Sequence, residues 1–180
     1  DDHTTDGTPR WGIALRDYVR YTGDRSIVAE LYPNVQASIE GALAIFTDAA
    51  GYLVHADNET WMDARREPDK VSYSPRSTRA NDIQALWYEQ LRAGADFATA
   101  LGDEESATRW SVAADRLRNR FAHDFVDPAT GRMADHLDAR DAPNLQVRPN
   151  LLFSLQLLDQ PADAARAARQ AWEALVYPWG

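Results

Sequence analysis

Apolar residues recur at steps of three and four along most of the chain. In one such stretch, after Asp103, the apolar positions are Ala107, Trp110, Ala114, Leu117 and Phe121. An α-helix repeats every 3.6 residues, so this spacing places all of them on one face. Aspartate is a favoured N-cap residue, and acidic residues such as Glu104 suit the first turn. The pattern therefore predicts an amphipathic helix that begins directly after Asp103.

The same period predicts five further helices. One covers 27–46, although Pro33 should break or kink it because proline lacks the backbone N–H that a helix interior needs. Others cover 9–22, 83–101, 149–158 and 161–175. No run of alternating apolar residues is long enough for a sheet. The fold class expected is all-α.

These helices repeat with a period of about 80 residues. Tight joints at 23–24, 102–103 and 159–161 divide them into three helix hairpins, at about 1–50, 81–126 and 147–176. The returns between hairpins are longer, and the one over 54–80 has no periodicity of its own. Connections longer than about 12–15 residues are usually functional or disordered. We therefore expect 54–80 to be a long loop that carries a site.

Composition narrows the classes of partner. The 180 residues are 44% apolar, which suits a single domain with a sizeable core. A net charge of −9 gives no basic surface for nucleic acid, and no apolar run approaches the roughly 20 residues of a membrane helix. The chain has no cysteine, and its histidines share no metal-ligand spacing, so we expect neither a metal nor another cofactor. We expect a cytoplasmic protein, although the lack of cysteine does not fix the compartment.

The tryptophans fall into two groups. Trp11, Trp110 and Trp172 lie on helical stripes, so we expect them in the core. Trp61 lies in the long loop, where an indole has no periodic face to join, and stacking on a ligand is at least as good an interpretation as packing. Trp87 is intermediate, because it follows helical spacing but stands in the first turns after the loop.

Three ordered motifs resemble a known family. They are Glu-Thr-Trp-Met-Asp-Ala at 59–64, Asn-Asp-Ile-Gln-Ala-Leu-Trp-Tyr at 81–88 and Val-Arg-Pro-Asn-Leu-Leu-Phe at 147–153. Together they resemble the glucosidase domain of glycogen debranching enzymes, the amylo-alpha-1,6-glucosidases, which are six-hairpin glycosidases. The chain departs from that family at Asn81 and Asp82, where the family usually has Val-Glu, and in the loop between Asp63 and Arg79.

The resemblance implies an (α/α)6 toroid, of which this chain would form about half, with the site at the N-terminal ends of the inner helices. It implies that Asp63 is the general acid of an inverting hydrolase of α-glucosidic bonds. We expect partial burial of Asp63 beside an indole, since burial favours the protonated form that a proton donor needs. The residues that it implies for substrate binding are Asp6, Trp61, Arg79, Asp82, Trp87, Arg148 and Asn150.

An inverting glycosidase also needs a second carboxylate roughly 6.5–9.5 Å from the acid. No residue of this chain matches that base, which the resemblance places in a later part of the domain, so catalysis by the chain alone stays open. The partners expected are an oligo- or polysaccharide of the α-glucan type, and either a second copy of the chain or the remainder of the same domain.

Two alternatives remain. One is a related toroid hydrolase of the invertase or trehalase kind, since these share a Trp-x-Asp loop and an acid before Ile-Gln-Ala-Leu. The other is a non-catalytic helical scaffold that binds sugar or protein, because three hairpins are compatible with a short solenoid.

Overall fold

The structure is a computed structural model that describes residues 4–178, and helices dominate it. In chain order these are α1 (Gly7–Thr22), α2 (Ser26–Gly41), the π-helical turn η1 (Ala42–Phe46), α3 (Asn81–Leu101), α4 (Glu104–Phe125), the 3-10 helix η2 (Pro149–Leu157) and α5 (Pro161–Leu175). The all-α fold class is confirmed.

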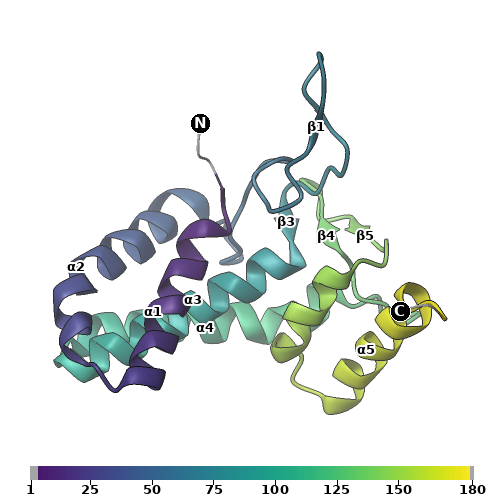
Figure 1. The fold of residues 1–180 in the computed structure, drawn as a ribbon. Coiled ribbons are helices and arrows are strands. Elements are labelled where there is room, and N and C mark those ends of the chain that lie inside the picture. Colours follow the sequence, from purple (N-terminus) through teal and green to yellow (C-terminus); the bar gives the residue numbers. More distant parts are fainter. Residues whose placement is uncertain (1–3, 179–180) are drawn as a thin grey trace.

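Short joints separate consecutive helices into three pairs, α1–α2, α3–α4 and η2–α5. Figure 1 shows α3 and α4 in the middle, with α1 and α2 on one side and η2 and α5 on the other. The long connection between η1 and α3 rises above the helices, and its β1 hairpin projects away from them. The helices thus form a base, and the loop over 54–80 lies above it (Figure 1).

Strands are short in the described part of the chain, with two residues in each. Within the long loop, β1 (Arg65–Arg66) pairs antiparallel with β2 (Val71–Ser72). At the end of the loop, β3 (Arg79–Ala80), β4 (His136–Leu137) and β5 (Pro143–Asn144) form an antiparallel sheet in the order β3-β4-β5. This sheet joins the start of α3 to the connection that follows α4.

Asp103 caps α4 as the sequence predicts. Its Oδ1 accepts a hydrogen bond from the backbone N–H of Ser106 at 3.1 Å. Its Oδ2 accepts from Tyr32 Oη at 2.7 Å and from Gln36 Nε2 at 3.0 Å, and both donors belong to α2. One carboxylate therefore starts α4 and ties it to α2.

The sequence predicts that Pro33 breaks or kinks this helix, and the structure shows that Pro33 does not break α2. The helix continues through Pro33 to Gly41 before it widens into η1. The following turn holds Val35 and Ile39, which are 3% and 0% exposed. Burial of an aliphatic side chain is worth roughly 1.5–3 kcal/mol, so two buried residues can offset the proline's cost of about 3 kcal/mol.

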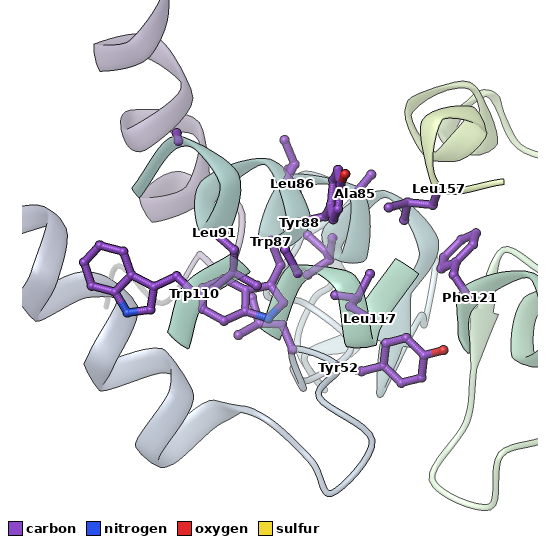
Figure 2. Packing of buried hydrophobic residues seen from close by; sticks show 14 of the residues in the cluster. Tyr52, Ala85, Leu86, Trp87, Tyr88, Leu91, Trp110, Leu117, Phe121 and Leu157 are labelled. Atoms are coloured by element: carbon purple, nitrogen blue, oxygen red, sulfur yellow. The ribbon is translucent and has the colours of Figure 1, made fainter. Parts of the chain in front are cut away.

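The core is centred on α3, which is buried on every face along much of its length. Figure 2 shows Trp87 and Leu91 of α3 packed with Trp110 and Leu117 of α4. Gly94 of α3 makes this packing close, since a methyl group there would lie 2.3 Å from the Ile39 side chain of α2. The three central helices therefore approach at a position that only glycine fits without rearrangement.

The tryptophan predictions have mixed outcomes. Trp110 is 0% exposed, and its Nε1 donates to Glu40 at 2.6 Å, so its place in the core is confirmed. Trp11 and Trp172 are 38% and 67% exposed, so the prediction is wrong for both. They lie on α1 and α5, at the two flanks of the helical layers, where no further element of residues 4–178 covers them.

Candidate functional site

The N-terminal ends of three helices meet beside the long loop. Asp6 precedes α1, Asp82 lies in the first turn of α3, and Asn150 lies in the first turn of η2. The guanidinium carbon of Arg10, in the first turn of α1, stands 6.0 Å from the centre of the Phe153 ring of η2. The starts of α1 and η2 are therefore neighbours, although about 140 residues separate them in the sequence.

A buried ionic cluster lies at this meeting point, and Arg76 is its centre. Arg76 is 0% exposed. Its Nη2 donates to Asp82 Oδ1 at 2.7 Å, and its Nε and Nη2 donate to the two carboxylate oxygens of Asp135 at 2.8 and 2.9 Å. The pairing with Asp135 is bidentate, which matches the planar guanidinium fork. We call Arg76, Asp82, Asp135, Arg148 and Asn150 the Arg76 network.

Asp135 is the most heavily bonded carboxylate of the network. Arg148 Nη1 donates to its Oδ2 at 2.6 Å, and His136 Nδ1 donates to the same oxygen at 3.2 Å. Burial by itself would raise the pKa of Asp135, but the hydrogen bonds from His136 and Arg76 and the charges of the arginines outweigh it and lower the pKa to about 2. Asp135 is therefore an anion at neutral pH.

Asn150 connects the network to the loop. With its amide turned to satisfy its neighbours, its oxygen accepts from Nη1 and Nη2 of Arg76, both at 2.9 Å. In this orientation the same oxygen lies 3.4 Å from Sδ of Met62, which is a packing contact and not a hydrogen bond. Met62 stands between Trp61 and Asp63 in the sequence. The network thus touches the segment of loop that carries the first motif.

Other bonds hold the loop at its base. The backbone N–H of Ala80 donates to Nε2 of His55 at 2.9 Å, which leaves the proton on Nδ1 to donate to the carbonyl of Ala56. Burial lowers the pKa of His55 and so favours this neutral ring. Asp57 Oδ1 accepts from the backbone N–H of Ser77 at 2.8 Å and closes the loop between its two ends.

Asp63 itself is exposed, so the expectation of partial burial is wrong. The reason is local, because Asp63 stands at the base of the projecting hairpin, where Tyr73 N–H donates to the carbonyl of Ala64 at 3.0 Å. No other described residue forms an ion pair with Asp63. Trp61 is 50% exposed, so its ring is accessible to a ligand.

Two of the residues expected at the site lie elsewhere. Trp87 is 0% exposed in the core of α3, so its ring is not presented to a ligand. Arg79 points into a different hollow of about 450 Å³, where its Nη1 pairs with Asp48 at 3.2 Å and with Asp141 at 2.5 Å. Asp6, in contrast, remains at the start of α1 beside the loop. It is 9% exposed, and its Oδ2 accepts a hydrogen bond from Nε of Arg10 at 3.3 Å.

Sequence reasoning missed Arg76 and Asp135, which hold the network together. Arg76 stands between a proline and a serine in the loop, and Asp135 follows an alanine in a connection. Neither position has a periodic pattern or a metal-ligand spacing. They are 59 residues apart, and only the pairing of β3 with β4 brings their segments together.

Chemically, the carboxylates of the site divide into two kinds. Asp82 and Asp135 are 2% and 1% exposed and are both paired with Arg76. Asp135 accepts from Arg76, Arg148 and His136, whereas Asp82 accepts from Arg76 through Oδ1. Asp63 is open to solvent and to a ligand. In the described residues, no cluster of three or more acidic or histidine side chains could hold a metal ion. A search of residues 4–178 finds no helix that is both long and apolar enough to span a membrane.

Comparisons with known proteins agree with this fold. The family model for amylo-alpha-1,6-glucosidase matches residues 3–180. No curated protein sequence matches. Among solved structures, the GH78 family rhamnosidase of Bacillus sp. GL1 is similar with a TM-score of 0.73 at 19% identity, over 97% of this chain and 18% of that chain.

A rhamnosidase from Klebsiella oxytoca, solved with rhamnose bound, is similar with a TM-score of 0.74 at 18% identity, over 97% of this chain and 32% of that chain. This chain therefore spans less than a third of the length of either structure. At such identities the likeness shows the fold, which is that of the six-hairpin, (α/α)6 toroid glycosidases. The family match extends over nearly all of the sequence, and the chain belongs to the amylo-alpha-1,6-glucosidase family.

Proposed function

We propose that this chain is part of a glycoside hydrolase that cleaves α-glucosidic bonds of the debranching type, with Asp63 as the general acid of an inverting mechanism. One observation carries the proposal. Asp63 is an accessible carboxylate, next to an exposed indole, on a loop that the buried Arg76 network supports through Met62. Family membership supports the choice of an α-glucosidic substrate.

In this proposal each exposed group has a simple task. Asp63 gives its proton to the glycosidic oxygen as the bond to the leaving group breaks. Trp61 offers an apolar face to the C–H side of a sugar ring. Arg148 is the most accessible member of the Arg76 network, with 18% of its side chain exposed, and it binds sugar hydroxyls at the edge of the network. Asp82 and Asn150 lie behind Arg148, in the buried part of the network.

The second carboxylate of the mechanism is not in the Arg76 network. Asp82 and Asp135 are each committed to Arg76, and their oxygens are buried. The proposal therefore places the base outside the described site.

The same proposal includes a cytoplasmic location, which fractionation of cells that express the protein tests directly.

Substitution of Asp63 by asparagine tests the proposal in the full-length protein. A positioned acid contributes roughly 10²–10⁴-fold, so Asp63→Asn should lower kcat on branched maltooligosaccharides by that factor while sugar affinity persists. Asp69→Asn is the matched control. Asp69 is an exposed aspartate of the neighbouring hairpin, and its partner is Arg66 in that hairpin. The control should keep wild-type turnover.

A panel of substrates separates this proposal from the other hydrolases. Sucrose, trehalose and an α-rhamnoside should be cleaved at least tenfold more slowly than the branched glucan. Near-normal turnover of Asp63→Asn would exclude Asp63 as the acid. A preference for one of the other sugars would keep the acid and overturn the substrate class.

A further inference from the structure

We infer that Arg76 is a positioning residue for Asp63: it clamps the long loop to three separate elements and so fixes the segment that carries the proposed acid. The role of Asp63 as the acid rests on the proposed function. The attachment of the loop by Arg76 does not depend on that role. Of the described side chains in the loop over 54–80, only that of Arg76 donates hydrogen bonds to α3, to Asp135 directly before β4, and to η2.

The geometry of the guanidinium supports this role. Its nitrogens donate to Asp82 of α3, to Asp135 next to β4, and to Asn150 of η2. A lysine ammonium is a compact donor and cannot form this bidentate fork. Because Arg76 is 0% exposed, water cannot replace any partner that is lost. The clamp therefore depends on the shape of the arginine as well as on its charge.

The charges of the network balance. Arg76 and Arg148 face Asp82 and Asp135, which gives two positive and two negative groups in direct contact. Removal of Arg76 alone would leave a buried negative charge without a partner, and such losses are strongly destabilising. A simple truncation would therefore mix unfolding with loss of position. Removal of one charge of each sign avoids this.

The connection from the clamp to the acid is short. Arg76 donates to the Asn150 oxygen, this oxygen packs against Met62 Sδ at 3.4 Å, and Met62 is bonded to Asp63 through the backbone. Asp63 has no ion pair of its own among the described residues, so its place depends on its neighbours in the loop. Loss of the clamp should free the segment 57–72 while the helices keep their packing.

The experiment compares three variants of the protein: Asp82→Asn, Arg76→Met with Asp82→Asn, and Arg76→Lys. The double variant keeps the balance, with Arg148 and Asp135 left as a pair, and Asp82→Asn alone is its matched control. Amide hydrogen exchange of 57–72 is measured against exchange of α4, and kcat and KM for the branched glucan are measured in parallel.

For the double variant we expect exchange of 57–72 at least tenfold faster than in Asp82→Asn, with α4 unchanged. Relative to Asp82→Asn, we expect kcat of the double variant to fall at least tenfold with KM changed less than threefold, because the acid is misplaced while the sugar binds as it does in that control. Arg76→Lys should also free the loop, since it keeps the charge and loses the fork.

Three results would overturn the inference: equal loop exchange in the double variant and its control, faster exchange throughout α4 as well, or full protection of the loop by lysine. Failure of the proposed function has a different outcome. If Asp63→Asn retains turnover while loop exchange follows Arg76 as described, the acid is misassigned and the clamp stands.

Discussion

Gly94→Ala should destabilise the protein, although alanine is the better helix former. The added methyl would lie 2.3 Å from Cδ1 of Ile39 and 3.0 Å from Cε3 of Trp110. Both neighbours are 0% exposed, so they can make room only by repacking within the core. Overpacking of a core costs about 1–3 kcal/mol, and the 2.3 Å approach places this case near the upper end. Alanine recovers about 1 kcal/mol in helix propensity, which leaves a net loss of about 2 kcal/mol.

Gly41→Ala is the matched control, with the opposite sign. Gly41 has φ −61°, and a methyl group there would meet nothing within 4 Å. That variant should gain about 0.5–1 kcal/mol, because the glycine's extra freedom in the unfolded chain is removed. The contrast between the two glycines isolates packing from propensity.

Urea unfolding, followed by tryptophan fluorescence, measures both changes. With an m-value of about 2 kcal/mol/M, Gly94→Ala should shift the midpoint down by about 1 M. The double variant of Gly94→Ala with Ile39→Val removes the methyl that clashes, and it should cost at least about 1 kcal/mol less than the sum of the single variants. A Gly94→Ala protein as stable as wild type, or strictly additive costs, would refute the reasoning.

Two further predictions concern pH and association. The folded pKa of His55 is below its ordinary value of 6.5, so the stability that its neutral ring provides is complete above that pH and is lost as the pH falls below it. The urea midpoint of wild type should therefore fall between pH 7.5 and pH 5, and it should fall less steeply in His55→Gln. His123→Gln is the control, because the His123 ring is exposed, and its midpoint should fall as in wild type. Equal slopes in all three proteins would contradict this prediction. We also predict that the purified 180-residue chain associates, because Leu152, Phe153 and Trp172 are 50%, 50% and 67% exposed. Light scattering should give a mass above that of the monomer, and Trp172→Glu should lower that mass. A purely monomeric protein at roughly 50–100 μM would contradict the predicted association.

Local sequence patterns predicted most of the helices. Asp103 caps α4 because its carboxylate needs only a partner three residues away. Helical period alone failed at Trp11 and Trp172, because period identifies a face and does not say whether another element covers it. Trp87 shows the opposite limit. It looked accessible because it follows the loop, but α3 is central and is enclosed on all sides.

The site was predictable only in part for a similar reason. Motifs located Asp82, Arg148 and Asn150, which do lie together in the Arg76 network. The two residues that join them, Arg76 and Asp135, have partners far away in the sequence, and no spacing rule reports such contacts. Arg79 has the same chemistry as Arg76 and stands three residues later, yet it turns to Asp48 and Asp141 instead.

The hairpin of β1 and β2 has a consequence for how the protein can diversify. Its base is closed by the bond between Tyr73 and Ala64, and its tip, from Glu67 to Lys70, is exposed. Doubling the length of a flexible loop costs only about 0.6 kcal/mol in closure entropy, and exposed tips tolerate insertions. Descendants of this sequence can therefore lengthen or rewrite the hairpin beside Asp63 without touching the Arg76 network. Under the proposed function, selection can thus change which part of the substrate is recognised beyond the terminal sugar while the buried support stays constant.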